Sequence, residues 1–109
     1  MEFFKLMKEK SEQKLDTRVP TIAFLGDSVT EGCFELYMKT KERYETEYRS
    51  GDAYHTCLRK ILAFLFPNVP VNIISSGISG DNSTGGLKRV QRDVVAHTPD
   101  LTVVCFGLN

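Results

Sequence analysis

The triplet Gly26-Asp27-Ser28 stands where a buried strand should end and a helix should begin. The preceding run, V-P-T-I-A-F-L over residues 19–25, is typical of a strand buried on both faces of a parallel sheet. A glycine at its end allows a sharp turn, which presents the Ser28 hydroxyl at the carboxyl end of the strand. Open α/β sheets carry their chemistry along that edge. A serine hydroxyl held there is the kind of group that attacks an ester carbonyl.

Two further polar groups follow apolar runs later in the chain. The run V-N-I-I (71–74) is predicted to be a strand and leads into the loop S-S-G-I-S-G-D-N-S-T-G-G, which contains Gly80. A third strand is predicted over 101–106, and Asn109 comes three residues later. Alternation of strands with helices implies right-handed crossovers and a parallel sheet with helices on both faces. All three strands then end at one edge, which gathers Ser28, Gly80 and Asn109 in one crevice.

Two stretches between these strands have the three- and four-residue apolar spacing of a helix that buries one stripe. Asp52 is a good N-cap for the first, and Pro67 and Pro70 stop it. His97 and Pro99 close the second. The apolar positions are Tyr54, Cys57, Leu58, Ile61, Leu62 and Leu65 in the first helix, and Leu87, Val90, Val94 and Val95 in the second.

The remaining segments precede the first strand and follow Ser28. Residues 2–15 are predicted to form a short amphipathic helix that docks on the flank of the domain, a membrane or partner anchor being the alternative. Residues 30–50 are rich in charge, with aromatic residues interleaved. We expect a solvated helix plus loop there, and its place beside Ser28 makes it a candidate lid or substrate-facing wall.

Composition narrows the class of protein. The 109 residues are 41% hydrophobic and 26% charged, as in an ordinary globular domain. Lys plus Arg (14) balances Asp plus Glu (14), so no net field attracts nucleic acid or an anionic membrane. No apolar run approaches the roughly 20 residues that span a bilayer, and no secretory signal is recognisable at the start of the sequence. Three widely spaced cysteines suggest reduced thiols and a cytoplasmic location.

Three short sequence blocks, one after each predicted strand, together resemble the motifs of a known family. Gly26-Asp27-Ser28-Val29-Thr30, Gly77-Ile78-Ser79-Gly80-Asp81-Asn82-Ser83 and Phe106-Gly107-Leu108-Asn109 resemble, in this order, the first three blocks of the SGNH hydrolases, also called the GDSL esterase and lipase family. The resemblance covers roughly residues 20–109. It implies an incomplete three-layer flavodoxin-like α/β fold with strand order 2-1-3. Residues 1–109 are then the amino-terminal portion of a single domain, with 1–18 as a helical extension.

The resemblance also implies roles for individual residues. Ser28 is the nucleophile of an ester hydrolase. The oxyanion hole comes from the Ser28 N–H, the Gly80 N–H and the Asn109 side-chain amide, because preorganised donors must point at the developing charge. Asp27 supports the turn and belongs to no catalytic triad. The family needs no metal or organic cofactor, and its substrates are small esters such as acylated sugars or lipids.

The sequence departs from the family in one large respect. The D-x-x-H block, which supplies the catalytic aspartate and histidine, is absent from residues 1–109, and neither His55 nor His97 stands in such a motif. Ser75 and Ser76 also replace the asparagine that commonly precedes the second block. We therefore expect these residues alone to be a poor esterase and part of a longer hydrolase. The unpaired strand 101–106 would pair with a second copy or with a missing carboxyl-terminal segment.

Plainer interpretations of each block remain open. Ser28 could be only a helix N-cap, the run D-N-S-T-G-G could be a turn before a helix capped by Ser83 or Thr84, and Asn109 could be a loop residue. The alternative function is a non-catalytic module of the same fold that binds a carbohydrate or a small anion at this helix start. Nucleotide binding is disfavoured, since neither G-x-G-x-x-G nor G-K-[ST] is present.

Overall fold

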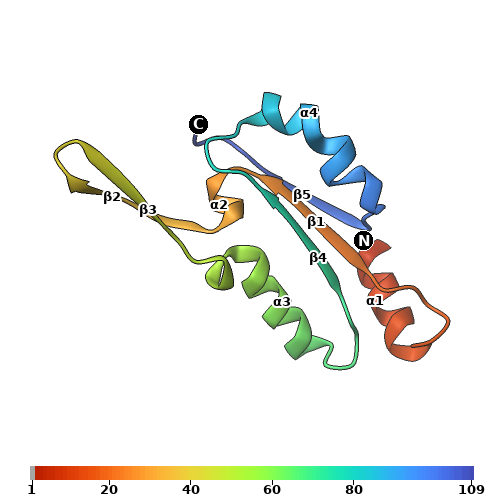
Figure 1. Cartoon of the computed structure of the whole chain (residues 1–109). Coiled ribbons are helices and arrows are strands. Elements are labelled where there is room, and N and C mark those ends of the chain that lie inside the picture. Colours follow the sequence, from red (N-terminus) through yellow and green to blue (C-terminus); the bar gives the residue numbers. More distant parts are fainter. Residues whose placement is uncertain (1) are drawn as a thin grey trace.

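Three parallel strands form the central sheet of the protein (Figure 1). The computed structural model describes residues 2–109. The strands lie in the order β4-β1-β5, and in register Gly26 of β1 is the partner of Gly77 in β4 and of Cys105 in β5. The predicted 2-1-3 order and incomplete flavodoxin-like α/β fold are confirmed. The strand bounds are Thr21–Gly26 for β1, Asn72–Gly77 for β4 and Leu101–Cys105 for β5.

Two helices cover one face of the sheet. These are α1 (Glu2–Glu12) and α3 (Tyr54–Leu65). Phe3 and Met7 of α1 are buried, so the predicted docking of this helix on the domain is confirmed. Its side chains join a core that also takes residues from β1 and α3, and the buried members are Phe3, Met7, Ile22, Phe24, Leu62 and Val69.

The other face is covered by α4 (Ser83–Asp93), followed by the short helix η2 (Val95–His97). A smaller apolar cluster lies beneath α4 and is made of Ala23, Leu25 and Val94, with Ile74, Val90 and Phe106 packed against it. The N-cap of α4 is Asn82, whose side chain accepts hydrogen bonds from the amides of Thr84 and Gly85. The expected caps, Ser83 and Thr84, instead lie inside the first turn.

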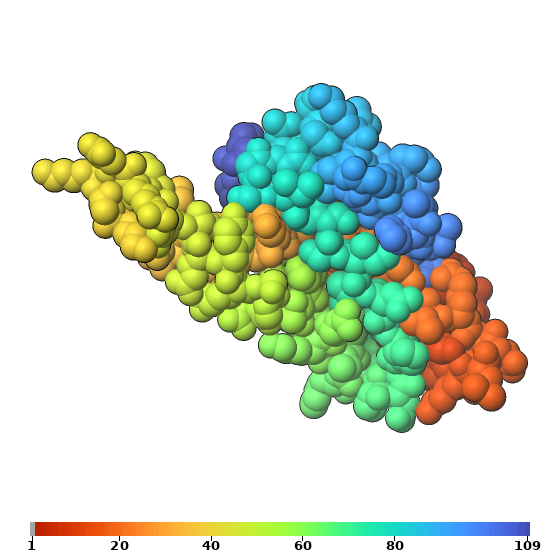
Figure 2. Space-filling model, in the orientation of Figure 1, coloured from red at the N-terminus to blue at the C-terminus, as the bar shows by residue number. Residues whose placement is uncertain are grey.

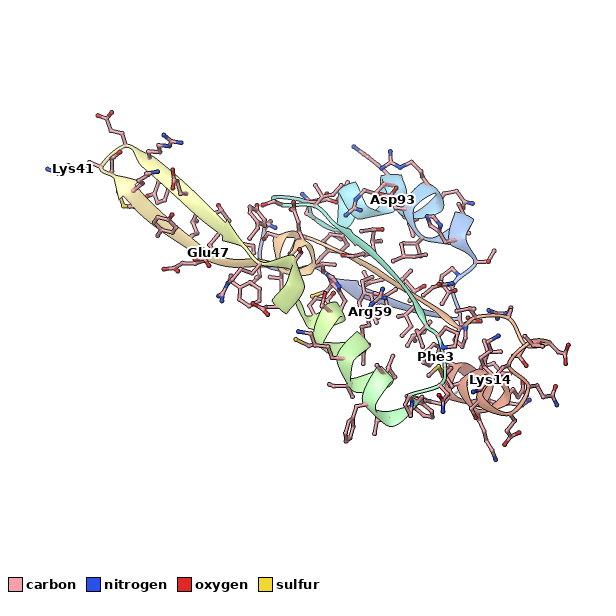
Figure 3. All side chains as sticks on the ribbon, turned by 60° about the horizontal axis from the view of Figure 1, so that its bottom comes forward. Phe3, Lys14, Lys41, Glu47, Arg59 and Asp93 are labelled. Carbon is pink, nitrogen blue, oxygen red and sulfur yellow. The ribbon has the colours of Figure 1, made fainter. Side chains whose placement is uncertain are left out.

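The segment after Ser28 differs from the prediction. After the single-turn helix α2 (Ser28–Glu31) the chain forms an antiparallel hairpin of β2 (Cys33–Thr40) and β3 (Arg43–Tyr48), so the expected solvated helix plus loop is wrong. The hairpin projects from the rest of the molecule, and Lys41 lies at the tip of the hairpin (Figures 2 and 3). The longest extent of the molecule, hairpin included, is 58 Å.

The hairpin forms because its side chains alternate with a period of two. Tyr37 lies opposite Glu45, and their face carries the hydrogen bond between the tyrosine hydroxyl and the Glu45 carboxylate. Leu36 and Met38 lie on the other face, where Tyr44 is the cross-strand partner of Met38. Alternation of apolar and charged side chains suits two strands with one apolar face and one charged face.

The start of α3 also differs from the prediction. Asp52 belongs to the 3₁₀ helix η1 (Ser50–Asp52), and the N-cap of α3 is Ala53, whose side chain caps nothing. Asp52 is therefore not the cap, because it ends the 3₁₀ helix and Ala53 lies between it and the first residue of α3. The predicted stripe is buried only in part, with Leu62 in the core and Ile61 exposed. Among residues 2–109, no helix is long and apolar enough to cross a bilayer.

Candidate active site

The turn after β1 is held by Asp27. This residue is the N-cap of α2, is buried, and accepts a hydrogen bond from the Val29 amide on Oδ1 at 3.1 Å. Ser28 follows as the first residue of α2 and is half-buried. The alternative in which Ser28 itself is the N-cap is therefore wrong. A Cβ added to Gly26 would lie 2.0 Å from Thr30 Oγ1, so glycine is needed for α2 to turn back over the strand end.

The loop after β4 holds Gly80 in a left-handed conformation. Its φ is 76°, which favours glycine, and the residue is exposed. A Cβ there would meet no atom within 4 Å, so within the protein the backbone angle is what requires glycine. Gly77 is different, because a Cβ on it would lie 2.1 Å from the Glu31 amide nitrogen. The second block is thus packed directly against α2.

Hydrogen bonds join the three blocks at the carboxyl edge of the sheet. The Ile78 amide donates to the Gly26 carbonyl oxygen at 3.1 Å, and the Ser79 amide donates to Glu31 Oε2 at 2.6 Å. Asn109 Nδ2 donates to the Asp81 carbonyl oxygen at 2.9 Å. The first block is therefore tied to the second, and the second to the third. Glu31 was not singled out from the sequence, although it is three residues from Ser28.

Arg89 is a second residue that the sequence analysis missed. Its side chain is 8% exposed, and its guanidinium binds Asp81, Asp93 and two backbone carbonyl oxygens. The hydrogen bond from Arg89 is the main cause that lowers the pKa of the Asp81 carboxyl below its ordinary value. The one sequence signal is the pair Arg89 and Asp93, which stand four residues apart on a helix.

The two histidines occupy different environments. His55 is buried in α3, and its Nε2 lies 3.0 Å from the Thr30 carbonyl oxygen and 3.1 Å from Ser75 Oγ. A carbonyl oxygen only accepts, so Nε2 carries the proton and donates it. His55 therefore connects α3 to α2 and β4. His97 ends η2, which precedes the amino end of β5, whereas Ser28 follows the carboxyl end of the parallel strand β1.

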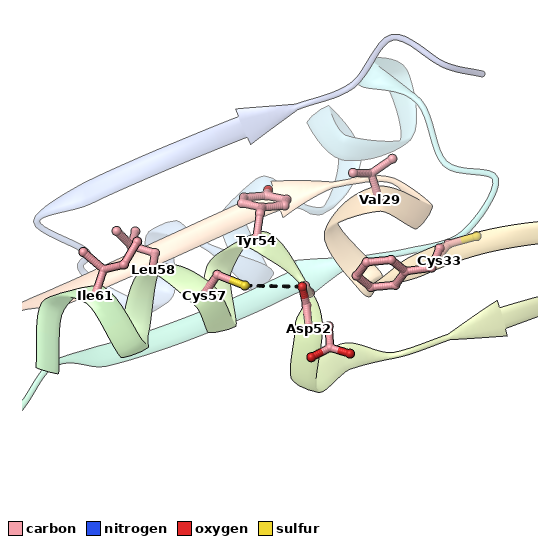
Figure 4. A pocket seen from close by; sticks show the side chains of 9 residues that line it. Val29, Cys33, Asp52, Tyr54, Cys57, Leu58 and Ile61 are labelled. Atoms are coloured by element: carbon pink, nitrogen blue, oxygen red, sulfur yellow. Dashed lines mark hydrogen bonds between the residues drawn. The ribbon is translucent and has the colours of Figure 1, made fainter. Parts of the chain in front are cut away.

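An apolar groove of about 430 Å³ opens beside the turn (Figure 4). Val29, the neighbour of Ser28, lines one side, and the exposed flank of α3 lines the other. Tyr54 also lines the groove; its hydroxyl lies 2.9 Å from Thr30 Oγ1, and burial raises its pKa. No cluster of three metal-ligating side chains occurs within residues 2–109. The lining residues are Val29, Cys33, Phe34, Asp52, Ala53, Tyr54, Cys57, Leu58 and Ile61.

Comparison with known proteins identifies the family to which the chain belongs. The family model for the GDSL-like lipase/acylhydrolase family matches residues 24–109. No curated protein matches the chain. Among solved structures, a lipase/acylhydrolase from Enterococcus faecalis is 29% identical over 82% of the chain, with a TM-score of 0.57. A variant of an acetyl xylan esterase from Geobacillus stearothermophilus is 25% identical over 83%, with a TM-score of 0.60.

A two-domain esterase active on acetylated mannans covers more of the chain. It aligns with 97% of the residues at a TM-score of 0.70 and 24% identity, which shows the fold. The chain spans 24% of the length of that esterase and 39% of the length of the other two proteins.

Proposed function

Because the chain belongs to the GDSL-like lipase/acylhydrolase family, we propose that it carries the nucleophile and the oxyanion hole of a serine ester hydrolase. Ser28 Oγ attacks the ester carbonyl and loses its proton to a base, and the alcohol leaves as the acyl-enzyme forms. Water then attacks the acyl-enzyme and releases the acid. The observation that carries the proposal is the meeting of all three blocks at one edge of the sheet.

Three donors would stabilise the tetrahedral oxyanion. They are the N–H of Ser28, the N–H of Gly80 and the side-chain amide of Asn109. An amide group has two hydrogens, and Asn109 uses one of them on the Asp81 carbonyl oxygen. That bond orients the carboxamide and leaves the second hydrogen for the oxyanion.

Neither histidine described here is suited to receive the proton of Ser28. His55 Nε2 is already in hydrogen-bond contact with the Thr30 carbonyl oxygen and Ser75 Oγ. His97 precedes the amino end of β5, whereas Ser28 follows the carboxyl end of β1. The proposal therefore includes a base supplied from outside residues 1–109 and little esterase activity for these residues alone. Oxyanion stabilisation and binding persist without a triad partner, while strong activation of the serine is lost.

A fluorophosphonate probe tests the proposal on the complete natural protein. The expected result is covalent labelling at Ser28, found by peptide mass spectrometry and abolished in Ser28→Ala. Ser50→Ala, which removes another serine hydroxyl close to α2, should be labelled like the wild type. Labelling that survives in Ser28→Ala, or no labelling of the wild type, contradicts the assignment.

The proposed substrate is a small acyl ester of a sugar or a lipid. This proposal is supported by the similar solved structures, which include a lipase/acylhydrolase and an acetyl xylan esterase. Rates on 4-nitrophenyl acetate and 4-nitrophenyl octanoate separate short from longer acyl groups. The proposed macromolecular partner is a second copy or another segment, paired along the open edge of β5.

A further inference from the structure

Arg89 has the environment of a residue that holds other groups in place. A guanidinium that is 92% buried must be paired, because an unpaired buried charge is costly. Its Nε donates to Asp81 Oδ2 at 2.8 Å, and Nη1 lies 3.2 Å from Asp93 Oδ2. Its other bonds go to the main chain, with Nη1 donating to the Ser76 carbonyl oxygen at 2.8 Å and Nη2 to the Gly26 carbonyl oxygen at 2.9 Å.

The acceptors of Arg89 lie next to the proposed catalytic groups. Gly26 is the last residue of β1, two residues before Ser28. Ser76 is the neighbour of Gly77 at the end of β4. Asp81 is the residue directly after Gly80. One planar guanidinium therefore ties together two strand ends and the loop that presents the Gly80 amide.

Asp81 in turn connects Arg89 to the third block. Its Oδ1 accepts the Asn82 amide at 2.8 Å, and its carbonyl oxygen accepts the Asn109 side chain at 2.9 Å. A Cβ on Gly85 would lie 1.8 Å from Asp81 Oδ1, so this glycine makes the space that the carboxylate occupies. The carboxylate is thus fixed on both oxygens, and the main chain of the same residue orients Asn109.

We propose that Arg89 is a positioning residue that, through Asp81, sets the Gly80 amide and the Asn109 carboxamide at the distance an oxyanion requires. The inference deepens the proposed esterase function and rests on it. Oxyanion donors act because they are aligned before the charge develops, so a small displacement of the loop lowers kcat more than it changes substrate binding. Arg89 touches neither substrate nor reacting atoms in this scheme.

The test compares Arg89→Lys with Arg92→Lys in the complete natural protein. Lysine keeps the charge of Arg89, but one ammonium lacks the planar fork of donors that reaches the four acceptors of Arg89. Arg92 lies on the same helix, is exposed and, among the described residues 2–109, pairs only with Asp93, so it is the matched control. With 4-nitrophenyl acetate, Arg89→Lys should lower kcat about 10- to 100-fold and leave KM within about threefold. Arg92→Lys should keep the wild-type kcat and KM.

Two further measurements separate positioning from folding. Hydrogen exchange followed by mass spectrometry should show faster exchange over residues 78–82 in Arg89→Lys, with the β1 peptides unchanged. Asp81→Asn removes the ion pair and keeps the side-chain shape, so it should also lower kcat, but by a smaller factor than Arg89→Lys does. The proposal is overturned if Arg89→Lys keeps the wild-type kcat. It is also overturned if the fall in kcat is fully accounted for by the fraction of Arg89→Lys protein that is unfolded.

Failure of the esterase function would look different. If the wild type hydrolyses no ester and takes no phosphonate label, the proposed function fails and positioning for catalysis fails with it. If the wild type is active and the Arg89→Lys loop exchanges like the wild type, only the role of Arg89 is wrong.

Discussion

Asn109 and Asp81 form the contact by which the third block reaches the second. The bond has the ordinary length of 2.9 Å, and its acceptor is a main-chain carbonyl oxygen, so the position of the acceptor depends on the loop rather than on a mobile side chain. Asp27 and Asn82 act in a similar way, since each caps the helix that starts beside the candidate site. Hydrogen bonds therefore fix this edge of the sheet, where apolar packing is thin.

Asn109→Ala should lower the rate of the chemical step. Loss of one oxyanion donor costs about 2.7–4 kcal/mol of transition-state stabilisation, which is a fall of roughly 10²- to 10³-fold in kcat. Steady-state kinetics with 4-nitrophenyl acetate on the complete natural protein measure it. Asn68→Ala, in the exposed loop after α3, is the control and should match the wild type. A fall of less than threefold in Asn109→Ala would remove this residue from the oxyanion hole.

Three aspartates should make stability fall in acid. The pKa of Asp93 is lowered from 3.8 to about 2, mainly by its hydrogen bond from Arg92, and the pKa values of Asp81 and Asp100 are lowered by Arg89 and Arg18. A depressed pKa stabilises the folded state above the ordinary value, and this stability is lost as the pH falls through the folded value. The free energy of unfolding should therefore decline from about pH 5 to pH 2.

Urea denaturation at several pH values checks this expectation. Arg92→Ala removes the main cause of the Asp93 shift, so its free energy of unfolding should fall less steeply over the same range. If the free energy of unfolding falls equally steeply with pH in the wild type and in Arg92→Ala, then Asp93 does not contribute to the loss of stability in acid.

At the scale of elements, the periodicity of apolar residues predicts a helix or a strand correctly where one face of the segment is buried. The strands of the sheet and the two long helices after Ser28 follow from apolar spacing and from turn residues, whereas the strand order follows from the resemblance to the SGNH hydrolases. The hairpin is not predicted, because the density of charge over 30–50 is typical of a solvated helix, while the two-residue alternation that specifies the strands is weak where both faces are exposed. Arg89 could not be found in this way, since its burial depends on carbonyl oxygens from Gly26 and Ser76, distant in the sequence.

Helix α1 offers a matched pair of neighbouring phenylalanines. Phe3 is 2% exposed in the main core, and Phe4 is 49% exposed with its ring edge-on to Phe3. Phe3→Ala should lower the free energy of unfolding by about 3–5 kcal/mol, and Phe4→Ala by roughly 1 kcal/mol or less. Chemical denaturation followed by circular dichroism measures both. Similar losses for the two variants would mean that α1 is not docked through Phe3.

The hairpin should be the first part of the chain that a protease cuts. Its tip carries Lys41 in a tight exposed turn and Arg43 at the start of β3, and the strands bury little of either face. Brief trypsin treatment should cleave after one of these residues before it cleaves after Lys88 or Arg92 in α4, as read by mass spectrometry. Lys41→Gln combined with Arg43→Gln should delay the first cut. An initial cut within α4 would show that the hairpin is better protected than its exposure suggests.

At the scale of the whole molecule, the β5 side of the sheet exposes apolar side chains, among them Leu87 and Val104. Within the described part of the chain β5 pairs only with β1, and Val104 on it is 63% exposed. An apolar groove of about 190 Å³ adjoins the strand, lined by residues that include Leu87, Val104 and Phe106. A strand with free main-chain groups beside such a groove is suited to pairing with another strand.

The 109-residue chain should therefore associate through β5. In sedimentation velocity, the wild type is expected to show an average mass that rises with concentration over the micromolar range. Val104→Lys places a charge on the edge strand, which natural sheets use to prevent such pairing, so its mass should rise less. Phe64→Lys is the control, because Phe64 is 84% exposed but lies on α3, away from the edge. If the α3 substitution reduces association as much as Val104→Lys does, the contact is a general apolar one, and β5 is not the pairing surface.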